Sequence, residues 1–98
     1  MDLESFRGSL DGDQPPQGLG RPLQALWWAA QGEWDRAHRL AQAEPGADGA
    51  WVHAHLHREE GDRGNASYWY RRAGRAMSQQ PLAEEWEAMV AELLERQP

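Results

Sequence analysis

The stretch WVHAHLHREEGD, residues 51–62, holds three of the chain's four histidines together with two glutamates and an aspartate. Imidazole and carboxylate groups bind divalent metals such as zinc, and imidazole also transfers protons near neutral pH. On a helix each residue turns the chain by about 100°. His53 and His57, four residues apart, therefore share a face, and Glu60 lies near them. These three residues are the candidate ligands of a divalent metal.

The same helix face has a second interpretation without a metal. The H-E-x-x-H signature of zinc enzymes is absent, because Ala54 follows His53. A further ligand must come from elsewhere, and His38 is the one remaining histidine. If Gly61 instead marks a turn between two packed helices, His53 and His57 become half-buried core residues that are hydrogen-bonded to neighbours. Acid–base catalysis ranks lower, since no nucleophile stands beside them, and no catalytic residue is assigned.

His55 points away from the candidate ligands, on the face that carries Trp51 and Arg58. A Trp beside His and Arg can stack, donate hydrogen bonds and anchor a partner, so this face is predicted to bind a protein or peptide. The alternatives are a half-exposed helix face, or Trp51 packed on the preceding helix. A second binding patch is expected at Tyr68, Arg72 and Arg75, although basic residues near a helix C-terminus also favour the helix dipole and can pair with later glutamates.

The composition indicates a small helical domain. The chain has 98 residues, a hydrophobic fraction of 40% and six tryptophans. It contains no isoleucine or threonine, and Val52 and Val90 are its only valines. This scarcity of β-branched residues argues against a sheet, whereas the abundance of Ala, Leu, Glu, Arg and Gln favours helices. The glutamates at 84, 85, 87, 92 and 95 are expected to form a solvated face of the last helix.

The net charge of −6 disfavours nucleic acid and anionic membrane surfaces as partners. Cysteine is absent, which excludes disulfides and thiolate metal sites. The acidic start MDLESFRGSLDGD lacks the apolar run of a signal peptide, so a cytoplasmic location is expected. No cofactor is predicted. A homo-oligomer is compatible with the composition.

Helices are expected at about 22–31, 33–43, 48–60, 64–77 and 82–96, from apolar residues at helical spacing between Gly- and Pro-rich breaks. Their short connections predict antiparallel neighbours. Residues 1–21 are predicted to be a flexible or loosely docked arm, with a short helix around Phe6 as one possibility. The Gly- and Pro-rich run DGDQPPQGLGRP, residues 11–22, joins this arm to the first predicted helix of the domain. Residues 22–98 form the predicted domain.

An internal repeat accompanies these helices. Gly32 and Gly61 stand 29 residues apart, and so do Ala37 and Ala66. The segments GEWDRAHRLAQAEP and GDRGNASYWYRRAG resemble tetratricopeptide and Sel1-like repeats over residues 22–77. The period is shorter than the tetratricopeptide's 34, and two units need a cap to reach the usual minimum of about three. DGAWVHAHLHREEGDRGNASYWYRRAGR also resembles a family of small bacterial proteins, from which no activity carries over.

The predicted fold is thus all-α: two antiparallel helix pairs and a capping C-terminal helix in a tetratricopeptide-like stack. The repeat resemblance implies a non-enzymatic scaffold that binds proteins or peptides. The competing hypothesis is a metal-binding or small enzyme-like protein that uses His53, His57 and Glu60.

Overall fold

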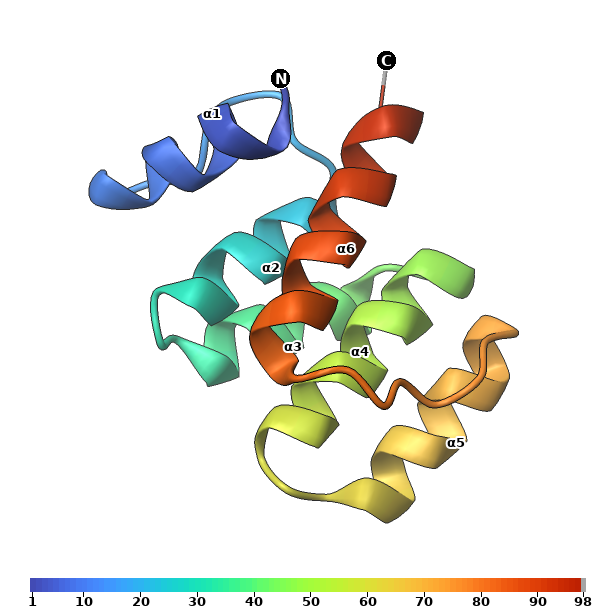
Figure 1. Ribbon diagram of the computed structural model, residues 1–98. Coiled ribbons are helices and arrows are strands. Elements are labelled where there is room, and N and C mark those ends of the chain that lie inside the picture. The colour runs from blue at the N-terminus through green and yellow to red at the C-terminus, as the bar shows by residue number, and fades with distance from the viewer. Residues whose placement is uncertain (98) are drawn as a thin grey trace.

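Short amphipathic segments, broken by glycine and proline, become the helices of the chain. The computed structural model describes residues 1–97, and Figure 1 shows that this part folds into helices without strands. None of these helices has the length and apolarity needed to cross a membrane. The elements are α1 (Leu3–Gly8), the 3₁₀ helix η1 (Ser9–Asp11), α2 (Arg21–Ala30), α3 (Trp34–Ala43), α4 (Ala47–Glu59), α5 (Arg63–Ala73) and α6 (Leu82–Arg96).

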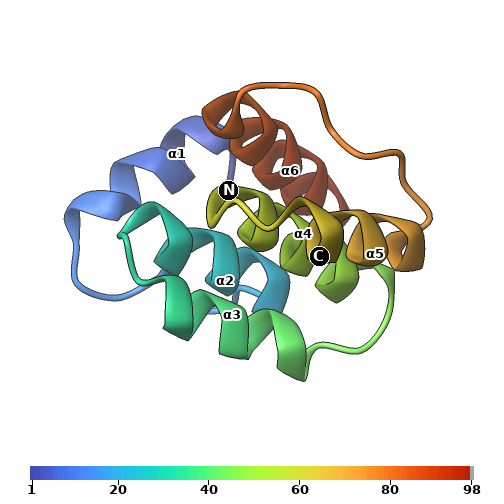
Figure 2. The ribbon, with the colours of Figure 1, turned by 90° about the horizontal axis from the view of Figure 1, so that it is seen from below.

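The helices pack in the pairs that the short connections predict. α2 lies along α3 and α4 lies along α5, and α3 also packs on α4 (Figure 2). α6 crosses to the other side of α4, where it contacts α2, α4 and α1. The all-α prediction is therefore confirmed, with α6 placed over the two pairs.

Helix α4 is the centre of the molecule. Its residues from Gly49 to His57 are all buried, because α2, α3, α5 and α6 surround it. The close turn from α3 into α4 requires Gly49, since a Cβ there would lie 2.1 Å from the carbonyl oxygen of Glu44. Side chains of α3 and α4 are thereby brought together across a short turn.

The N-terminal segment packs against the core through the short helix that the sequence allowed around Phe6. Phe6 of α1 is fully buried and its ring lies 5.8 Å from that of Trp86 on α6. The Trp27 indole donates a hydrogen bond to Ser9 Oγ at 3.0 Å, and Gln31 Nε2 donates to the Leu10 carbonyl at 2.7 Å. The apolar spacing of Leu3, Phe6 and Leu10 therefore marks a docked helix.

Helix α5 ends earlier than the sequence predicts. It stops at Ala73 rather than near residue 77, because Gly74 takes the left-handed conformation with φ of 73° and closes the helix. The residues after it run in an extended path to α6 (Figure 1). This path allows α6 to cross over α4.

Candidate functional site

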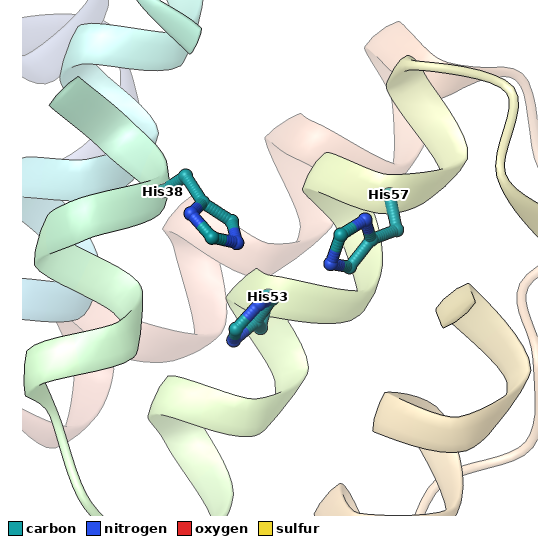
Figure 3. Close-up of side chains that lie close together, drawn as sticks. All are labelled: His38, His53 and His57. Carbon is teal, nitrogen blue, oxygen red and sulfur yellow. The ribbon is translucent and has the colours of Figure 1, made fainter. Parts of the chain in front are cut away.

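Three of the four histidines converge between α3 and α4. His38 comes from α3, and His53 and His57 come from α4 (Figure 3). One ring nitrogen from each lies within 4.8 Å of the others. The ring centroids are 4.5 Å apart for His38 and His53, 4.9 Å for His53 and His57, and 5.5 Å for His38 and His57.

The local structure explains why these three rings meet. The four-residue spacing places His53 and His57 on one face of α4, as predicted. That face lies against α3, and the tight turn at residues 44–46 joins the two helices. His38 and His53 stand at nearly equal sequence distances from Pro45 in the middle of this turn, seven residues before it and eight after it. In an antiparallel helix pair such positions face each other, and this symmetry is the signal that would have selected His38 from the sequence.

Two indole rings enclose the three imidazoles. Trp69 of α5 stacks on His53 with the centroids 3.8 Å apart and the planes 11° from parallel. Trp34 of α3 stacks on His38 at 4.8 Å and 12°. The Trp34 indole nitrogen donates a hydrogen bond to the Leu56 carbonyl at 2.8 Å, which fixes the position of this ring. These flat contacts fix the planes of two imidazoles and cover one face of each ring.

Glu60 lies beside the cluster without joining it. The predicted trio was His53, His57 and Glu60, whereas the structure groups His53 and His57 with His38. Glu60 Oε1 lies 2.6 Å from His57 Nδ1, so its carboxylate holds the nitrogen opposite the ligand position, Nε2. Metal-binding histidines are commonly oriented in this way by a carboxylate. The exposed Glu60 and Asp62 also lie near the buried His57, but Asp62 caps α5 through Asn65.

The free nitrogens of the cluster have the character of ligand atoms. Among residues 1–97, the rings of His38 and His53 have no hydrogen-bond partner, and His57 has only Glu60. Burial lowers the pKa of His53 to about 4, assisted by the nearby His38 and His57. Burial and the neighbouring His57 also lower the pKa of His38. The neutral imidazole, which is the form that binds metals, is therefore favoured.

The face carrying His55 is buried, which corrects the prediction that it is open to a protein or peptide partner. His55 is 1% exposed and Trp51 is 6% exposed, because α6 packs over them. Arg75 lies on the Trp51 ring, 3.4 Å from its centroid, and pairs with Glu92. Trp51, His55 and Arg75 are thus engaged within the protein.

Glu85 is the second correction, since it was expected on a solvated face and is 3% exposed. Its carboxylate contacts His55 Nδ1 at 2.6 Å and accepts a hydrogen bond from Arg58 at 2.7 Å, and another from the Tyr70 hydroxyl. Burial opposes its ionisation, but these hydrogen bonds outweigh burial and lower the pKa of Glu85. Burial also raises the pKa of Tyr70, which keeps its hydroxyl protonated. Arg58 and His55 are therefore partners of an internal carboxylate.

Tyr68 and Arg72 are the part of the predicted binding residues that faces solvent. The Tyr68 side chain is 43% exposed, and its hydroxyl accepts a hydrogen bond from Arg72 at 3.0 Å. The binding of a protein or peptide at this pair stays a prediction.

Comparison with known proteins gives no family for the chain: no protein-family model, curated protein or solved structure matches it. The tetratricopeptide and Sel1-like resemblance accordingly stays a prediction.

Proposed function

We propose that this protein binds a divalent transition metal, with zinc as the first choice, through His38, His53 and His57. The observation that supports the proposal is the convergence of three imidazoles from two helices, with ring nitrogens that have no other partner. Three imidazole nitrogens are a common donor set for zinc, and a fourth position is then left for water or another ligand. The proposal assigns no reaction.

The surroundings support metal binding over simple packing. The unpartnered imidazole nitrogens are not fully buried, so a metal ion can reach them. Trp34 and Trp69 lie against the rings with their flat faces and leave these nitrogens unoccupied. Glu60 supports the proposal as well, because it orients His57 with Nε2 towards the other rings.

Zinc binding would draw the three nitrogens closer together. In a tetrahedral site with zinc–nitrogen distances near 2.05 Å, the nitrogens stand about 3.3 Å apart. The three nitrogens here lie within 4.8 Å of one another. His38 is half-buried on a surface helix, so rotation of its side chain can close much of this gap. Bound zinc would then tie α3 to α4 and stabilise the fold by its binding free energy.

Zinc titration of the full chain, purified without a tag, tests the proposal. Calorimetry is expected to show one zinc per chain, and His38→Ala is expected to weaken binding at least a hundredfold. Arg39→Ala is the matched control, since its side chain is exposed on the same helix and lies outside the cluster. The proposal fails if zinc does not bind, or if the two variants bind it equally well.

A further inference from the structure

A cavity of about 410 Å³ lies on the opposite side of α4 from the three histidines. Its walls come from α2, the end of α4, the start of α6 and the N-terminal segment, and they include Leu10, Ala29, Leu82 and Trp86. The volume falls within the range of about 300–1,000 Å³ that is usual for small-molecule sites. The apolar wall suits an aliphatic or aromatic body.

His55 presents a ring nitrogen to this cavity. Its Nδ1 lies 2.6 Å from the buried carboxylate of Glu85, which accepts its proton in a hydrogen bond and leaves Nε2 as the free ring nitrogen. Nε2 has no partner among residues 1–97, yet no side-chain nitrogen or oxygen there is both fully buried and unpartnered. The 1% of His55 that is accessible must therefore include Nε2, and His55 lines the cavity.

The charges around the cavity leave one negative group uncompensated. Arg7 and Glu87 at its edge form an ion pair at 2.5 Å, and Arg58 behind His55 is paired with Glu85. Glu59 also lines the cavity, one helical turn after His55, and forms no ion pair among the described residues. A carboxylate without an ion-pair partner favours a positively charged donor. The Trp86 ring on the wall can also attract a cation.

We propose that this cavity is a binding site for a small organic cation, namely a protonated amine with an apolar body. The ammonium group would face the Glu59 carboxylate, while the apolar body would lie against Leu10, Leu82 and Trp86. The site shares no residue with the histidine cluster, so it stands or falls independently of zinc.

The probes for the test are n-hexylamine, n-hexanol and hexanoate, which share one tail and differ in the charge of the head. Each is titrated into the isotope-labelled full chain, and NMR follows the amide signals of cavity residues and the His55 ring nitrogens. Hexylamine is expected to bind saturably, with hexanoate at least tenfold weaker. Glu59→Gln is expected to weaken hexylamine at least fivefold and to leave hexanol unchanged.

Two matched variants test the location. Ala83 is exposed on α6 and lines the cavity, so Ala83→Trp is expected to block hexylamine. Ala88→Trp places the same side chain at an exposed position of α6 away from the cavity, and binding should persist. Equal binding of hexylamine and hexanoate, or undiminished binding in Ala83→Trp, would overturn the proposal. Repeating the titration with His38→Ala separates this outcome from that of zinc binding.

Discussion

His38 on α3 and His53 on α4 meet edge to face, with their ring centroids 4.5 Å apart and their planes perpendicular. This contact joins two helices that the repeat pattern assigns to different pairs. It also brings together three imidazoles, of which the sequence alone selected two. The proposed zinc site depends on this contact between α3 and α4.

Glu60 is predicted to strengthen zinc binding by orienting His57. Glu60→Gln replaces the carboxylate that contacts His57 Nδ1, so zinc affinity should fall by about 10–100-fold, as for other supporting carboxylates. Glu59→Gln is the matched control, since it alters charge equally one position away and is expected to leave zinc affinity within threefold. Competition with a chromophoric chelator measures both. Equal losses in the two variants would show a general charge effect instead.

The free energy of unfolding of the metal-free protein is predicted to fall at acidic pH because of His53. Its pKa is about 4 in the folded protein, against about 6.5 in an unfolded chain. Between these values the unfolded chain binds the additional proton, so this stabilisation is complete above pH 6.5 and is lost as the pH falls towards 4. The change should reach about 3 kcal/mol. Urea unfolding with a chelator present measures it.

The control for this pH dependence is His53→Phe, which keeps a ring against Trp69 but cannot titrate. Its free energy of unfolding should vary less between pH 6.5 and 4 than that of the natural protein. An identical pH profile in the two proteins would contradict the assignment to His53.

Glu85 is predicted to stabilise the fold strongly despite its charge. Glu85→Gln removes the carboxylate that Arg58, His55 and Tyr70 share, and leaves the Arg58 charge poorly compensated. The expected loss is about 3–5 kcal/mol in the free energy of unfolding. Glu84→Gln, at the exposed neighbouring position, should change it by less than about 0.5 kcal/mol. Chemical denaturation measures the free energy of unfolding of both variants. Equal losses in the two would contradict a specific role of the buried Glu85.

The N-terminal helix is predicted to contribute to the core. Phe6 is fully buried, so Phe6→Ala should cost about 3–5 kcal/mol, whereas Met1→Ala, at a residue 60% exposed, should cost almost nothing. Thermal unfolding compares the two. Similar midpoints would show that α1 packs more loosely than described.

Helical periodicity predicted most of the helices of this fold. The apolar stripes and the Gly and Pro breaks located α2, α3, α4 and α6 to within a few residues, because these features act locally. The end of α5 was missed, since Gly74 closes the helix while Met77 continues the apolar spacing. The apolar spacing within one helix does not show which other helix covers that face.

That missing information accounts for the errors at the candidate sites. The sequence predicted His55 and Trp51 on a binding surface and Glu85 on a solvated face, because nothing in the pattern placed α6 over α4. One usable signal was nevertheless present in the sequence. His55 and Arg58 on α4 call for an acidic partner, and the glutamates of α6 could supply it. His53 and His57 followed from their spacing, whereas His38 required the pairing of α3 with α4 across their short turn.

X-ray absorption at the zinc edge of the protein loaded with one equivalent of zinc tests the proposed metal site most directly. We predict three imidazole ligands, with nitrogens about 2.0–2.1 Å from the metal. We also predict one fewer imidazole in His38→Ala. A spectrum with one imidazole or none, or one that is unchanged in His38→Ala, would contradict the claim that His38, His53 and His57 form a metal site.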